Sequence, residues 1–121
     1  MGFPSPAQDY VEQRISLDKL CIDKPGATYF MKAGRSAPSV GIVKGALLVI
    51  DASLTPVHGS VICAAVSGEF RLRRYVTHPV RGLAELEPPG QVTPLEEENE
   101  FDDVKTVWGV VTYWITPASA V

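Results

Sequence analysis

Four stretches in the middle of the chain have the composition of β-strands. They are rich in β-branched and aromatic residues and are bounded by turn-forming residues, as strands require. These stretches cover residues 28–33, 46–51, 60–66 and 69–76. A longer stretch of the same kind, residues 104–116, lies near the end of the chain and carries both tryptophans. The pattern predicts a small, mainly β domain.

The segments between these stretches carry turn signals. Ser67-Gly68 separates the third and fourth stretches and predicts a two-residue hairpin, because glycine adopts positive φ without steric cost. The Pro-Pro-Gly sequence at 88–90 and the acidic run at 96–98 predict a polar, solvated excursion before the last strand.

The beginning of the chain carries helix signals. Ser5 followed by proline is typical of an N-cap and first helical position, and it predicts a short helix to about Gln13. Ser16 predicts the cap of one further helical turn. We therefore divide the chain into an N-terminal arm with a short helix, residues 1–15, and a β domain, residues 16–121.

Size and charge narrow the possible functions. The 121 residues suffice for one domain with a modest core, and 45% hydrophobic with 21% charged residues is ordinary globular composition. A net charge of −3 gives no concentration of cations for binding phosphates, so we expect no direct contact with nucleic acid. We interpret the one basic cluster, Arg71, Arg73 and Arg74, as a solvated strand face.

The two cysteines predict neither a zinc site nor a disulfide framework, because they lack the paired spacing of such sites. Cys63 lies in the apolar run 61–66, where a free thiol behaves as a small hydrophobe. No apolar run approaches the roughly 20 residues of a membrane span, and no signal peptide is recognisable. We expect a cytoplasmic protein without metal or cofactor.

Seven short segments follow one another in an order shared with a known family. They are GFPSPA at 2–7, DYVEQRI at 9–15, ATYF at 27–30, LLVID at 47–51, HGSV at 58–61, GEF at 68–70 and VWGVVT at 107–112. In these segments the chain resembles the LexA/UmuD self-cleaving serine peptidase family. The first segment is similar to the sequence that follows the scissile bond in that family, so the chain resembles the processed, UmuD′-type product. The resemblance is weak from residue 84 to 105.

The resemblance implies a fold and an active site. The fold would be a small curled, barrel-like β-sheet of the LexA C-terminal type with a short N-terminal helix. The active site would be a serine–lysine dyad, in which burial lowers the lysine pKa so that a neutral amine can take the serine proton. The resemblance places Ser36 at the nucleophile position and Arg73 at the lysine position.

Several substitutions indicate that this dyad is broken. Arginine stays protonated up to a pKa above about 12, so Arg73 cannot act as the base. Around Ser36, Arg35 stands where an acidic or small residue is usual, Ala37 replaces a methionine, and the stretch just before is one residue short. Ser39 is a second candidate nucleophile.

Other residues offer weaker alternatives for catalysis. Lys32 and Lys44 flank the serine in sequence, at positions that the family does not use. His58, His78 and Asp51 are the only further material for a Ser-His-Asp triad, and we interpret the two histidines as surface residues in turns.

Three functions remain open. The resemblance implies a homodimer that binds a Y-family DNA polymerase catalytic subunit for error-prone translesion synthesis in the SOS response. The last strand, Val107 to Ile115, would then either supply a dimer edge or fill the core. The second possibility is an active serine–lysine autopeptidase that cuts in trans. The third is an inactive homologue that regulates UmuD-like or LexA-like relatives through mixed dimers.

Overall fold

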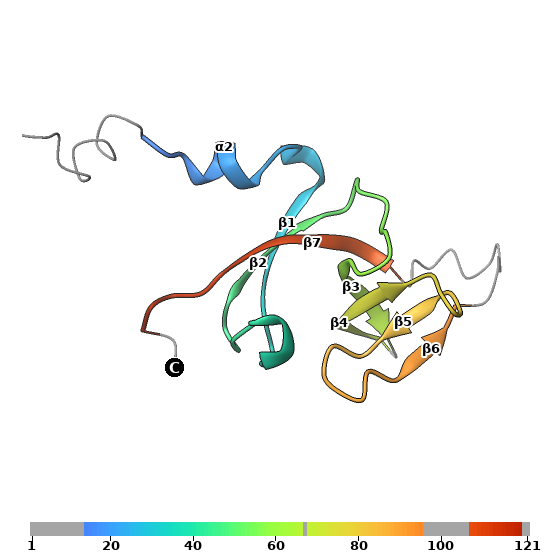
Figure 1. Ribbon diagram of the computed structural model, residues 1–121. Helices are drawn as coiled ribbons and strands as arrows, with labels where there is room; N and C mark the ends of the chain where they lie inside the picture. The colour runs from blue at the N-terminus through green and yellow to red at the C-terminus, as the bar shows by residue number, and fades with distance from the viewer. Residues whose placement is uncertain (1–13, 67, 96–106, 120–121) are drawn as a thin grey trace, which may run out of the picture.

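Within the part of the chain that the structure describes, one short α-helix precedes an antiparallel sheet of seven strands (Figure 1). The computed structural model describes residues 14–66, 68–95 and 107–119. The strands are β1 (Thr28–Lys32), β2 (Leu47–Asp51), β3 (Val61–Val66), β4 (Glu69–Val76), β5 (Gly82–Ala84), β6 (Val92–Pro94) and β7 (Val107–Ile115). The helix is α2 (Leu17–Cys21), and two 3-10 turns are η1 (Pro25–Ala27) and η2 (Pro38–Val40).

The strand predictions are largely confirmed. The four middle stretches form β1 to β4 with bounds shifted by at most one residue, and the last stretch forms β7. The first three residues predicted for that last strand, 104–106, lie outside the described residues. β5 and β6 were not predicted, because each is only three residues long and lies in the region interpreted as a loop. Residues 88–90 of that region do form the turn between them.

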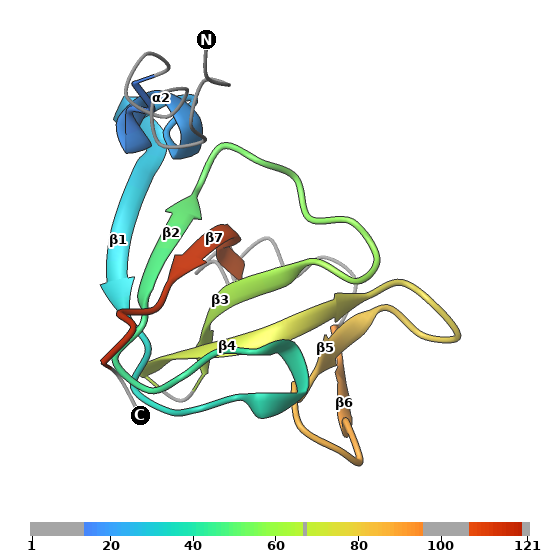
Figure 2. The ribbon, with the colours of Figure 1, turned by 60° about the vertical axis from the view of Figure 1, so that its left-hand side comes forward.

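The sheet is curled, as the resemblance implied, and it does not close into a barrel. Its order is β1-β2-β7-β3-β4-β5-β6, so within the described part of the chain β1 and β6 are its two ends. Figure 2 shows β1 and β2 running in a different direction from β3 and β4. β7 joins these two halves, since it pairs with β2 over Val110–Ile115 and with β3 over Val107–Val110.

The curl depends on a close approach between β7 and β2. A Cβ atom added at Gly109 would lie 2.5 Å from Cγ2 of Ile50, closer than real Cβ contacts come. Register shifts at Val49/Ile50 and Cys63/Ala64 mark the same crossing. Bulges of this kind increase strand twist, so they help β7 to turn from one half of the sheet to the other.

The core has two parts, one on each face of the sheet. Successive residues of a strand face opposite sides, so Val110 and Val111 of β7 belong to different clusters. The first cluster consists of Ala33, Ala37, Ile42, Ala46, Leu48, Ile50, Cys63 and Val111. The second consists of Ile62, Ala64, Tyr75, Leu83 and Val110. The first cluster lies beneath the candidate site.

The predicted cap at Ser16 is confirmed. Its Oγ accepts a hydrogen bond from the Lys19 N–H at 3.4 Å, and α2 follows directly. The earlier helix predicted to about Gln13 lies outside the described residues. In the ranges that the structure covers, no helix combines the length and apolarity needed to cross a membrane.

Candidate functional site

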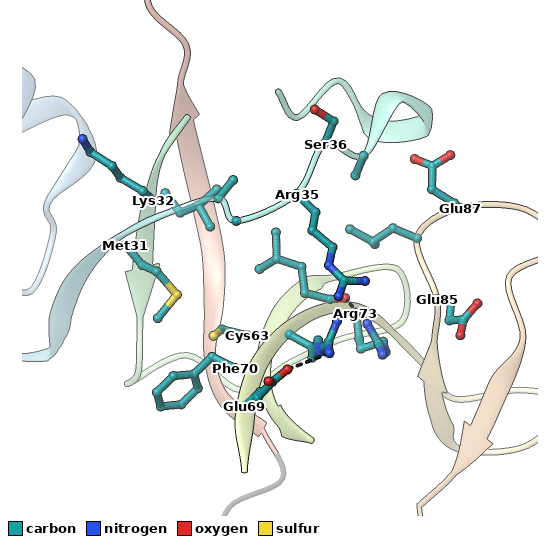
Figure 3. A pocket seen from close by; sticks show the side chains of 17 residues that line it. Met31, Lys32, Arg35, Ser36, Cys63, Glu69, Phe70, Arg73, Glu85 and Glu87 are labelled. Atoms are coloured by element: carbon teal, nitrogen blue, oxygen red, sulfur yellow. Dashed lines mark hydrogen bonds and ion pairs between the residues drawn. The ribbon is translucent and has the colours of Figure 1, made fainter. Parts of the chain in front are cut away.

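A pocket of about 480 Å³ lies between the end of β1, the segment that follows it, β4, and residues 85–87 after β5 (Figure 3). Leu48 and Cys63 of the first core cluster contribute to its lining. Ser36 and Arg73 both line it, although they are 37 positions apart in the sequence. The fold therefore brings the two predicted site positions to one pocket.

Ser36 lies in a loop that the backbone holds at several points. The Ala33 N–H donates to the Ala46 carbonyl at 2.9 Å, and Ala37 forms a two-way bridge with Ile42. Inside this loop the Ser36 Oγ accepts a hydrogen bond from the Lys44 backbone N–H at 2.9 Å. Figure 3 shows the hydroxyl directed away from the pocket interior.

Arg73 is half-buried on β4. Its Nη1 donates to the Leu72 carbonyl at 2.9 Å, and it is not in the same hydrogen-bond network as Ser36 within the described residues. Figure 3 shows Arg35 extending its guanidinium into the same pocket, while the Lys32 amine points away from it. Since Lys44 reaches Ser36 through its backbone, no side-chain amine is bonded to the serine in the part of the chain that the structure covers.

The interpretation of the basic cluster as a solvated strand face was wrong. Arg71, Arg73 and Arg74 are all half-buried, and each has a hydrogen-bond partner. Strand alternation separates them, because Arg71 and Arg73 line the pocket while Arg74 donates to the Gly59 carbonyl at 2.9 Å. Arg71 forms a salt bridge of 2.6 Å with Glu69.

Ser39 has a structural role in this arrangement. Its Oγ donates to the Leu86 carbonyl at 2.7 Å, and its N–H donates to Glu87 Oε1 at 3.0 Å. These bonds tie η2 to the segment after β5. Ser39 does not line the pocket, so the structure separates this second candidate nucleophile from Arg73.

The residues considered for a triad are not assembled around Ser36. His58 and His78 are exposed and stack on each other, with ring centroids 4.0 Å apart, and neither lines the pocket. Thr77 joins them, because its N–H donates to His58 Nδ1 and its hydroxyl contacts His78 Nδ1. The Asp51 carboxylate accepts hydrogen bonds from the hydroxyl and N–H of Ser53, which lower its pKa.

Sequence reasoning missed the acidic side of the pocket. Glu69, Glu85 and Glu87 line it together with the arginines. They come from β4 and from the segment after β5, where the resemblance was weak. The i, i+2 spacing of Glu69 and Arg71 on one strand was the one available signal. Within the residues described, no group of three or more His, Cys, Asp or Glu side chains is placed to hold a metal ion.

Comparison with known proteins identifies the family of the chain. The chain matches the Peptidase S24-like family model over residues 1–111. It is 38% identical to Protein ImpA of Escherichia coli over 115 residues, covering 94% of this chain and 76% of ImpA. It is 38% identical to Protein MucA of Escherichia coli over 113 residues, covering 93% and 75%, respectively. A LexA repressor of a Marinomonas species is 27% identical over 105 residues, covering 85% of this chain and 45% of the repressor. The chain therefore belongs to the Peptidase S24-like family, the LexA/UmuD family of serine peptidases.

Proposed function

We propose that this chain is a UmuD′-like accessory subunit that contributes a binding surface and does not cut peptide bonds. It dimerises and binds a Y-family DNA polymerase catalytic subunit for error-prone translesion synthesis in the SOS response. Membership of the LexA/UmuD family and the similarity to ImpA and MucA support this role. The observation that supports the loss of cleavage is that an arginine occupies the lysine position and that the Ser36 hydroxyl is hydrogen-bonded to the Lys44 N–H instead.

The chemistry of the pocket supports the loss of cleavage. A serine nucleophile needs a neighbouring base that is neutral near pH 7, and a guanidinium does not supply one. The Ser36 hydroxyl accepts the Lys44 N–H and points away from the pocket, so attack on a peptide in the pocket would require the loop to rearrange. Misplacement of a reacting atom by about 1 Å can cost about 100-fold in rate.

The shape of β7 supports dimerisation. β3 pairs with β7 only over Val107–Val110, so within the described residues the side of residues 111–115 that faces away from β2 has no strand partner. An unpaired strand edge is a ready template for another chain. Tyr113 and Ile115 are exposed there, whereas Val110 and Val111 are buried. The middle of β7 therefore packs in the core, and its last residues leave an unpaired strand edge in the described sheet.

Copurification with the polymerase tests the proposal. The chain is mixed with the Y-family polymerase catalytic subunit from the same organism, and the mass of any complex is measured by light scattering. We expect two copies of this chain for each polymerase. A folded dimer that binds no polymerase would overturn the proposal and favour the regulatory alternative, in which mixed dimers form with UmuD-like or LexA-like relatives.

A further inference from the structure

We propose that the pocket binds an extended peptide segment in which an acidic side chain follows or precedes an apolar one. Arg35 and Arg73 hold the carboxylate, and the apolar floor of the pocket takes the neighbouring side chain. This inference rests on the proposed function, because it assigns a ligand to a pocket that no longer cuts.

The pattern of ion pairs singles out these two arginines. Arg71 is paired with Glu69 at 2.6 Å, the one salt bridge in the described parts of the chain. Glu87 accepts the Ser39 N–H. Arg35 and Arg73 line the same pocket without a carboxylate within 4.0 Å among the residues that the structure covers.

Two guanidinium groups in one pocket favour an anionic ligand. Like charges repel more strongly where protein replaces water, and an anion between them converts that repulsion into attraction. Arg73 uses Nη1 on the Leu72 carbonyl, and the described residues provide no other acceptor for its remaining N–H groups. A carboxylate matches the planar fork of a guanidinium and can accept two parallel N–H bonds from it.

The remaining lining explains why the ligand is a peptide with an apolar residue. Apolar side chains from strands β1 to β4 and from the neighbouring loops build the floor, and Phe70 lines the pocket with 54% of its surface exposed. The apolar side chains that line the pocket include Met31, Leu48, Leu72 and Leu86. Glu85 lies on the β5 side of the pocket, where it disfavours a second acidic residue. A single acid beside an apolar residue fits both features.

Binding of short labelled peptides to the full chain tests this inference. The probe is a fluorescein-labelled, C-terminally amidated peptide with the sequence Gly-Leu-Glu-Leu-Gly, followed by fluorescence anisotropy. The matched peptide has Gln in place of Glu. We expect the Glu peptide to bind at least about tenfold more tightly, because hydrogen bonds between two charged groups are stronger than those to a neutral amide. Equal binding of the two peptides, or no binding of the Glu peptide, would overturn the inference.

Variants identify the residues that bind. Arg35→Gln and Arg73→Gln should each weaken binding of the Glu peptide about tenfold and leave the Gln peptide unchanged. Lys19→Gln removes the same charge from α2, away from the pocket, and should have no such effect. If Lys19→Gln weakened binding of the Glu peptide by the same factor, only the net charge of the chain would matter and the inference would be overturned. If Arg73→Gln fails to fold, Arg35→Gln still tests the inference, because Arg35 is exposed and its replacement should not disturb folding.

Two further measurements test the source of the carboxylate and whether the bound peptide is cut. A carboxylate could also come from the C-terminus of a peptide, and a Gln peptide with a free C-terminal carboxylate tests this source. If that peptide binds and the Glu peptide does not, the inference that the pocket binds an acidic side chain is overturned. Mass spectrometry of the recovered Glu peptide should find it intact. Cleavage would overturn the proposed loss of catalysis, whereas a polymerase complex without peptide binding would overturn this inference alone.

Discussion

At the scale of single residues, we expect Arg73 and Ser36 to limit catalysis in two independent ways. Replacing Arg73 by lysine supplies an amine but leaves the Ser36 hydroxyl bonded to the Lys44 N–H. We therefore expect neither the unmodified chain nor Arg73→Lys to cleave a LexA/UmuD-family precursor arm supplied in trans. The measurement is the appearance of the two fragments on a gel, with a self-cleaving relative as positive control.

The two possible deviations from that result have different meanings. Cleavage by Arg73→Lys alone would show that the serine loop rearranges easily and that the arginine is the only defect. Cleavage by the unmodified chain would contradict the assignment of Arg73 as an inactive replacement and would support the autopeptidase alternative.

The two thiols differ in their surroundings. Burial raises the pKa of Cys63 to about 11 from the ordinary 9.0, whereas Cys21 is partly exposed on α2. Because the thiolate is the reactive form, we expect one rapidly reacting thiol per folded chain at pH 8 in a colorimetric thiol assay. Cys21→Ser should abolish that rapid phase and Cys63→Ser should leave it unchanged. A rapid phase that survives Cys21→Ser would contradict the burial of Cys63.

The same thiol links folding to pH. Its pKa is raised in the folded state, so the neutral form is favoured by folding. The contribution of Cys63 to stability is thus complete below pH 9 and is lost progressively as the pH rises towards about 11. In Cys63→Ser, the denaturant midpoint should fall less between these two pH values than in the unmodified chain.

The two residues singled out from the sequence line one pocket, whereas their hydrogen bonds were not predicted. The resemblance identified Ser36 and Arg73 by their positions relative to strands that composition alone predicts. The structure places both residues in the lining of one pocket. The bond from the Lys44 N–H to Ser36 depends on how the loop of residues 33–46 closes, which no local pattern encodes. The acidic residues were missed because they meet the arginines only after β4 and β5 pair.

At the scale of elements, the crossing of β7 over β2 depends on Gly109. We expect Gly109→Ala to destabilise the chain by about 1–3 kcal/mol, because the added methyl would lie 2.5 Å from Ile50 Cγ2. Chemical denaturation followed by circular dichroism measures this loss. Gly26→Ala is the matched control, since a Cβ there meets nothing within 4 Å, and it should change stability by less than about 0.5 kcal/mol.

A double-mutant cycle tests the cause of that loss. Ile50→Ala removes the Cγ2 atom and should itself cost about 2–5 kcal/mol through the cavity that it leaves. The double variant Gly109→Ala/Ile50→Ala should be more stable than the sum of the two losses implies. Strictly additive losses would show that the strain at Gly109 comes from another contact.

The elements also show what strand composition can predict. Strands β1 to β4 and β7 have five or more residues and clear turn signals at their ends, so their composition was sufficient to predict them as strands. β5 and β6 are held mainly by pairing with β4 and with each other, and three residues carry too little pattern to indicate a strand. The close β7–β2 crossing was not predicted, because it depends on the order of strands in the sheet.

At the scale of the whole molecule, the open end of β7 sets the expected assembly. A two-fold partner that pairs along residues 111–115 would bring two copies of Tyr113 close to the symmetry axis. Tyr113 is 41% exposed, so a change there costs little in the monomer. We expect Tyr113→Lys to raise the dimer dissociation constant at least about tenfold, because like charges facing each other across paired strands are destabilising. Sedimentation velocity over a range of concentrations measures it.

Strand β1, at one end of the described sheet, supplies the control for this dimer. Phe30 is 54% exposed on β1, an end strand in the described sheet, so Phe30→Lys adds the same charge to a competing edge. We expect Phe30→Lys to leave the dimer intact. If Phe30→Lys produces monomers and Tyr113→Lys does not, the copies associate through β1. The end of β7 would then remain available to a different chain, and the polymerase subunit would be the first to test against Tyr113→Lys.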